Sequence, residues 1–80
     1  MTNAFQGFNL FNDIEDKILR IRNRAVVLSN IYEDNSKDGK INGKGAAIML
    51  GYFGRIPEAE RAMVQDKFIE DMKLRGFKIG

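Results

Sequence analysis

The chain has 80 residues, of which 44% are hydrophobic and 30% charged, and it contains neither cysteine nor histidine. A chain of this length supports one core, so we expect a single helical domain over residues 1–80. The composition excludes a disulfide scaffold, thiol chemistry and a disordered polymer. No apolar run reaches the roughly 20 residues that cross a bilayer, and the first residues lack a signal-peptide pattern. We therefore expect a cytoplasmic protein with no membrane segment.

Charge is balanced along the chain. Thirteen basic and eleven acidic side chains give a net charge of +2. The two signs are interleaved, whereas a protein that tracks phosphates usually gathers positive charge on one face. The net charge alone therefore does not predict nucleic-acid binding.

The first third of the sequence predicts an irregular arm followed by a long helix. Residues 1–10 are uncharged and mix Phe with Gly, Asn and Gln, which predicts the arm and the packing of Phe5 and Phe8 back on the body. A helix is predicted over 11–33, where acidic residues precede basic ones as the helix dipole favours. Its apolar residues recur at alternating steps of three and four: Phe11, Ile14, Ile18, Ile21, Ala25, Leu28 and Tyr32.

This apolar seam has two interpretations. It lines the core of a bundle, or it forms the contact between two copies of the chain. Around Ala25–Tyr32 the helix is apolar on nearly every side, because Val26, Val27 and Ile31 lie off the seam. Two short helices would not cover so much apolar surface, so we predict a homodimer through this helix.

The rest of the chain predicts a loop and two shorter helices. Residues 33–45 are rich in Gly, Asn, Asp, Ser and Lys and predict an exposed loop. Residues 46–54 carry no charge and predict a short buried helix over 45–53, with Gly54 as its cap. Pro57 opens a final helix over 57–75, which Gly76 stops. Its inward face should hold Ala62, Val64, Phe68, Ile69 and Met72.

These elements predict an all-α fold, a small three-helix domain. It combines a long first helix, a loop rich in Gly, Asn, Asp and Lys, a short apolar helix and a final amphipathic helix.

Part of the loop resembles the calcium-binding loop of EF-hand and dockerin domains. The family alternates short oxygen side chains around one cation and places a glycine at the sharp turn. Gly45 stands where the family has a bidentate acid, and Lys37, Lys40 and Lys44 add positive charge around the would-be ion. We therefore predict no metal and no cofactor, with a calcium module using Asp34, Ser36 and Asp38 as an alternative. The residues that match the family's positions one, three, five, six, eight and nine are Asp34, Ser36, Asp38, Gly39, Ile41 and Asn42.

A basic face on the first helix gives a further alternative, a nucleic-acid-binding regulator. Lys17, Arg20 and Arg24 share one helical face, and three loop lysines extend it. Asp13 and Asp16 adjoin the same face, and no familiar nucleic-acid-binding motif is present, so an ordinary solvated face is the competing interpretation. The full set is Lys17, Arg20, Arg24, Lys37, Lys40 and Lys44.

The sequence has few of the side chains that commonly act as nucleophiles or general bases in enzymes. It contains no His or Cys, one Thr and only two serines. We predict a non-enzymatic regulatory or inhibitory binding protein that acts through protein–protein contacts. Helical domains of this kind occur among phage accessory proteins that block host machinery, which is an association at the level of the fold. A structural subunit of a larger assembly is another alternative. The predicted partner-binding residues are apolar side chains that lie off the predicted core faces, together with arginine and aromatic neighbours. They are Leu19, Arg22, Val26, Tyr52, Arg61, Met63, Leu74 and Phe77.

Overall fold

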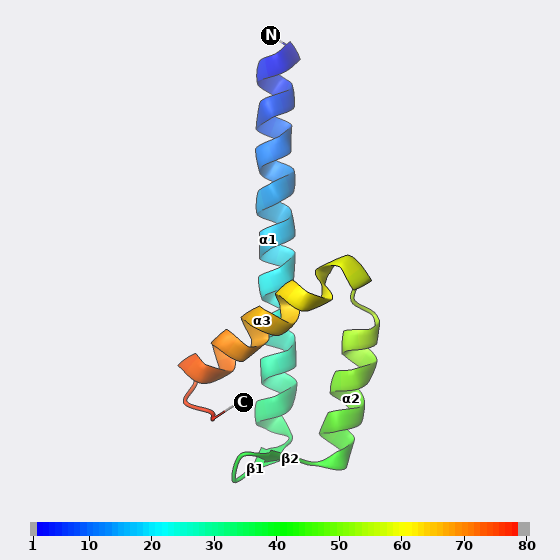
Figure 1. Ribbon diagram of the computed structural model, residues 1–80, viewed down its shortest axis with the longest axis vertical. Coiled ribbons are helices and arrows are strands. Elements are labelled where there is room, and N and C mark those ends of the chain that lie inside the picture. The colour runs from blue at the N-terminus through cyan, green and yellow to red at the C-terminus, as the bar shows by residue number, and fades with distance from the viewer. Residues whose placement is uncertain (1, 79–80) are drawn as a thin grey trace.

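The computed structural model describes the backbone of residues 2–78 and the side chains of residues 13–78. The predicted all-α fold with three helices is confirmed, with a two-stranded hairpin in addition. Figure 1 shows α2 and α3 beside the C-terminal half of α1, whose N-terminal half projects beyond them. The elements in chain order are α1 (Thr2–Asp34), β1 (Ser36–Lys37), β2 (Lys40–Ile41), α2 (Gly43–Gly54) and α3 (Glu58–Leu74).

α1 is longer than the sequence predicts. Helical backbone begins at Thr2, so residues 2–10 do not form the irregular arm predicted over 1–10. Each residue added to an existing helix gains a hydrogen bond without a new nucleation step, which lets the helix extend through this uncharged segment. The predicted packing of Phe5 and Phe8 lies outside the described side chains. Within the described residues, no helix has both the length and the apolar character that crossing a membrane requires.

The core lies where α2 and α3 each pack on the C-terminal half of α1. The seam residues Ile21, Ala25 and Leu28 are buried there. Ile14 and Ile18 are 47% and 53% exposed, because α2 and α3 do not extend along α1 as far as these residues. Among the described side chains of the seam, Ile21, Ala25 and Leu28 therefore lie in the core, and Ile14 and Ile18 lie on the surface.

α3 contributes Val64 and Met72 to the interior, and both side chains are fully buried. Phe68 is half-buried on the same face, as predicted. Ala62 is exposed, so its predicted place on the inward face is wrong. Two helical steps turn a side chain by about 200°, which points Ala62 away from the side that Val64 buries. Glu60, four residues before Val64, is the buried residue on that side.

The end of α3 follows the prediction at Gly76. Gly76 adopts a positive φ of 93°, which glycine adopts without a steric penalty. The Phe77 amide donates to the Met72 carbonyl at 3.0 Å, and the Gly76 amide donates to the Lys73 carbonyl at 3.0 Å. This pair of bonds is a Schellman motif, which satisfies carbonyl groups at the helix end.

The end of α2 differs from the prediction. Gly54 is its last helical residue and is not among the glycines with positive φ, so the predicted glycine cap is wrong. Instead, the guanidinium of Arg61, which belongs to α3, caps the end of α2. Its Nη2 donates to the Gly54 carbonyl at 3.1 Å, and its Nε donates to the Ile56 carbonyl at 3.0 Å.

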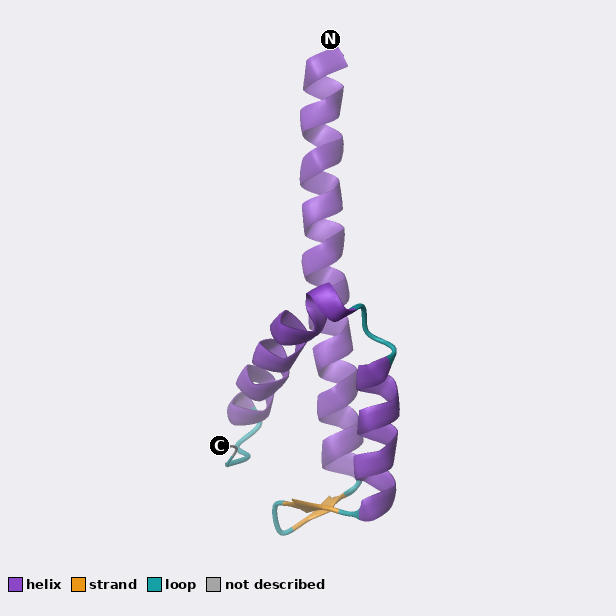
Figure 2. Cartoon of the chain, turned by 45° about the vertical axis from the view of Figure 1, so that its right-hand side comes forward, coloured by secondary structure: helices purple, strands orange, loops and turns teal. Residues whose placement is uncertain are grey.

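The exposed loop predicted over 33–45 is largely regular structure. α1 continues through Asp34 and α2 begins at Gly43, with an antiparallel hairpin between them (Figure 2). Asp38 and Gly39 have φ of 56° and 77°, the positive values that a type I′ two-residue turn requires. The Tyr32 hydroxyl donates to the Gly39 carbonyl at 2.8 Å, which ties the hairpin to α1.

Candidate binding groove

α2 is not the buried helix that its uncharged run predicts. Gly45 is its one buried residue, Met49 and Phe53 are half-buried against the core, and Leu50 is 74% exposed. The physical reason is that α3 packs on α1 rather than over α2, so one side of α2 stays uncovered. Large apolar side chains that cluster on an uncovered side are a signal for an interaction surface.

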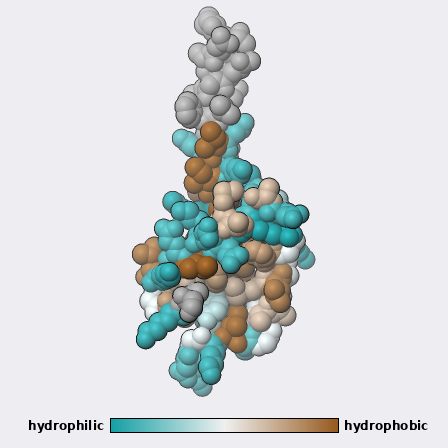
Figure 3. Space-filling model, viewed as in Figure 1, coloured by the Kyte–Doolittle hydropathy of each residue, from teal (hydrophilic) through white to brown (hydrophobic). Residues whose placement is uncertain are grey.

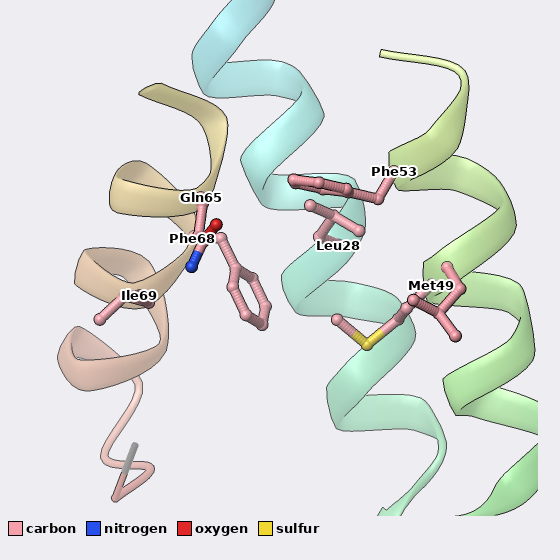
Figure 4. A pocket seen from close by; sticks show the side chains of 7 residues that line it. Leu28, Met49, Phe53, Gln65, Phe68 and Ile69 are labelled. Carbon is pink, nitrogen blue, oxygen red and sulfur yellow. The ribbon is translucent and has the colours of Figure 1, made fainter. Parts of the chain in front are cut away.

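An apolar groove runs between α2 and α3. It consists of two adjoining cavities of about 320 Å³ and 520 Å³, which share Met49, Leu50 and Phe68. α1 contributes Leu28 to the first cavity and Tyr32 to the second. Figure 4 shows Phe68 projecting from α3 toward Leu28 and Met49. The groove therefore has side chains of all three helices along it.

The chemistry of this groove suits an apolar ligand surface. Its side chains are aliphatic, aromatic or thioether, apart from Gln65, Lys78 and the Tyr32 hydroxyl that already bonds to Gly39. Methionine and aromatic side chains adapt their packing to different apolar partners. A groove between helices is one of the recurrent sites where an amphipathic helix docks.

The predicted partner-binding residues are spread over the molecule. Arg22, Val26 and Leu74 meet around a shallow cavity of about 210 Å³ between α1 and α3. Leu19 lies farther along the projecting half of α1, and Met63 lies exposed on α3. The structure brings part of the predicted set together and separates the rest.

Three of the predicted anchors stabilise the fold itself. Arg61 caps the end of α2. The ring of Phe77 packs edge to face on Tyr32, with 5.7 Å between the ring centroids. Tyr52 packs against the core. These side chains already have intramolecular partners.

The basic residues predicted for nucleic acid are also divided. The Glu60 carboxylate lies 3.1 Å from Nη1 of Arg24 and 3.5 Å from Nε of Arg20, so it links α3 to α1. Lys17 is exposed on the projecting part of α1. Lys37, Lys40 and Lys44 are exposed at the hairpin and the start of α2, beyond the other end of α1. Residues 17 and 34 are about 25 Å apart along a helix, so Lys17 lies far from the loop lysines.

The residues that resemble a calcium loop have local structural roles. The Ser36 hydroxyl donates to the Tyr32 carbonyl, and the Asn42 side chain accepts a hydrogen bond of 2.7 Å from the Gly45 amide at the start of α2. Asp34 ends α1, and Asp38 occupies the turn of the hairpin. Within the part of the chain described here, no three Asp, Glu, His or Cys side chains come together. Calcium binding stays an alternative prediction.

The sequence does not predict the groove, because its patterns place the residues of the groove walls in the interior. Met49 and Leu50 belong to the uncharged run 46–54, which predicts a buried helix, and the helical period predicts Phe68 on the inward face of α3. The available signal was the length of that run, since one amphipathic neighbour covers only part of a helix that is apolar all round.

Comparisons with known proteins add no family to this description. No protein-family model, curated protein or solved structure matches this chain.

Proposed function

We propose that this protein is a small, non-enzymatic regulatory or inhibitory binding protein that acts through protein–protein contacts. Its partner presents the apolar face of an amphipathic helix to the groove between α2 and α3. The observation that carries this proposal is the exposure of Leu50 beside Met49 and Phe68 in an apolar groove.

The dimensions of the groove fit a short helical segment. α2 has 12 residues, which span about 18 Å at the helical rise of 1.5 Å per residue. A partner helix of that length presents anchors at positions i, i+3 or i+4, and i+7. Full burial of one leucine side chain contributes about 1.5–3 kcal/mol, so Leu50 alone supports a measurable share of the affinity.

A regulatory or inhibitory effect follows from occupancy alone. A partner helix seated in the groove has its apolar face covered and is withdrawn from its other contacts. This mode of action needs no nucleophile or metal in the binding protein. The self-association expected from α1 uses a different surface, so groove binding and dimer formation are separable.

A model peptide tests the groove directly. The probe is a fluorescein-labelled leucine–lysine peptide of about 18 residues that forms an amphipathic helix, and its anisotropy is followed during titration with the full chain. Leu50→Ser should weaken binding about tenfold, because it removes a side chain that the peptide would bury. Leu74→Ser is the matched control, since Leu74 is 81% exposed and lies outside the groove. Equal affinities for the two variants, with unchanged helical circular dichroism, would contradict the groove.

A further inference from the structure

A second surface lies on α1 where its projecting part leaves the body of the protein. It is formed by Glu15, Ile18, Leu19 and Arg22, which surround a shallow hollow of about 280 Å³ and are called here the arm patch. Ile18 and Leu19 are 53% and 56% exposed. Figure 3 shows hydrophobic side chains on α1 between its N-terminal end and the body of the protein.

The projecting helix lacks tertiary support of its own. Every side chain from residue 13 to residue 20 is exposed, and the ion pair of Arg20 with Glu60 of α3, at 3.5 Å, lies at the C-terminal end of this stretch. Most helical stability in proteins comes from packing of an apolar face, and short helices without it are marginal in water. A surface that covers Ile18 and Leu19 would therefore stabilise this half of α1.

The charges of the arm patch are complementary to those of the same patch on a second copy of the chain. Glu15 and Arg22 flank the two apolar residues at equal distances, three residues before Ile18 and three residues after Leu19. In an antiparallel pair with its two-fold axis between Ile18 and Leu19, each Glu15 faces the partner's Arg22. Each Ile18 then faces the partner's Leu19. A parallel pair would instead place Glu15 beside Glu15 and Arg22 beside Arg22, and like charges side by side are unfavourable.

Both charged residues are available for such a contact. Among the described residues, neither Glu15 nor Arg22 has an ion-pair partner, whereas the neighbouring Arg20 and Arg24 pair with Glu60. Glu15 and Arg22 are seven residues apart, about 10 Å along the helix axis, which is too far for them to pair with each other. An intermolecular partner satisfies both charges.

We propose that the chain forms an antiparallel homodimer through the arm patch. The two-fold axis passes between Ile18 and Leu19, and each copy contributes the same surface, as an isologous interface requires. The contact is centred between Ile18 and Leu19, so it uses Ile18 of the apolar seam together with Leu19, which lies off the seam. It lies outside the groove, so it is independent of the proposed helix binding.

Charge reversal in the full chain tests this interface by sedimentation equilibrium. The unaltered protein should dimerise at micromolar concentrations. Glu15→Arg alone, or Arg22→Glu alone, should raise the dimer dissociation constant at least about tenfold, because each places like charges opposite one another twice. The double variant, Glu15→Arg with Arg22→Glu, restores opposite charges only in the antiparallel register. It should return the dissociation constant to near that of the unaltered protein.

Circular dichroism distinguishes loss of the dimer contact from loss of the helical fold. Each variant is measured at a concentration where it is monomeric, and each single variant is expected to keep its helical signal. An unaltered protein that stays monomeric throughout the micromolar range would overturn the proposal. So would single variants that dimerise normally, or a double variant that dimerises as weakly as the single ones.

Discussion

The backbone of Gly45 packs directly on Asn35 and Ile41, so closely that a side chain has no room. A Cβ atom at Gly45 would lie 2.9 Å from Cγ1 of Ile41 and closer still to Cβ of Asn35. Gly45→Ala must therefore push α2 away from Asn35 and Ile41. We expect the free energy of unfolding to fall by roughly 1–3 kcal/mol, as overpacking of a tight contact does. Thermal unfolding followed by circular dichroism measures this loss.

Gly43→Ala is the control for this substitution. Gly43 belongs to the same helix, but a Cβ there meets no atom within 4 Å. Alanine in that position should leave stability unchanged or raise it slightly, because it restricts the unfolded chain. Equal losses of stability in the two variants would show that the Gly45 contact is not tight in solution.

The ion pairs of Glu60 give a second prediction about stability. Glu60 lies in the first turn of α3, where it is buried, and its carboxylate forms ion pairs with Arg24 and Arg20 of α1. Glu60→Gln should lower the free energy of unfolding by roughly 1–3 kcal/mol, because charge-assisted bonds are lost while the shape is kept. Denaturant titration compares it with Glu58→Gln, which removes an exposed charge from the same helical turn. A similar effect of both substitutions would assign the loss to the helix dipole rather than to the ion pairs.

Arg61 is predicted to stabilise the fold without contributing to binding. Its guanidinium donates to the carbonyls of Gly54 and Ile56 at the end of α2. Arg61→Ala should lower stability by about 0.5–1.5 kcal/mol and leave affinity for the helical peptide unchanged. Chemical unfolding and the anisotropy titration measure the two properties on one preparation. A stable variant that no longer binds would restore the sequence-based prediction of Arg61 as a partner anchor.

Features governed by local chemistry were predictable from the sequence. Gly76 stops α3 because a left-handed residue is required one step beyond the helix, and that rule depends only on neighbouring residues. Ile21, Ala25 and Leu28 were placed in a seam by their period, and they are buried. The sequence also carries a signal for the hairpin, since the Asp38–Gly39 dipeptide favours a type I′ turn, although the composition of residues 33–45 predicts an exposed loop.

Features governed by distant contacts were not predictable in the same way. Period alone places Ile14 and Ile21 on one seam, but it does not say that α2 and α3 end before they cover Ile14. In the same manner, the uncharged run around Leu50 predicts burial, while the direction of α3 decides whether another helix covers it. The groove exists because α3 packs on α1, and no local pattern encodes that choice.

Calcium should have no effect on stability. The Ser36 hydroxyl and the Asn42 side chain already hydrogen-bond within the hairpin and the α2 cap. A ligand that binds only the native state raises the melting temperature by mass action, so millimolar calcium should leave it unchanged. Differential scanning calorimetry with and without calcium provides the measurement. A rise of several degrees that Asp34→Ala and Asp38→Ala abolish would support a calcium site instead.

The most direct test of the groove uses methionines as reporters within one molecule. Met49 lies in the groove, Met63 is exposed on α3 outside it, and Met72 is fully buried. The chain is labelled with ¹³C-methyl methionine and titrated with the amphipathic leucine–lysine peptide, and a scrambled peptide of the same composition serves as the control. Groove binding predicts that the Met49 methyl resonance shifts with saturation while that of Met63 stays in place, and that the scrambled peptide has no effect. Equal shifts of Met49 and Met63, or no shift of Met49 at saturating peptide, would contradict it.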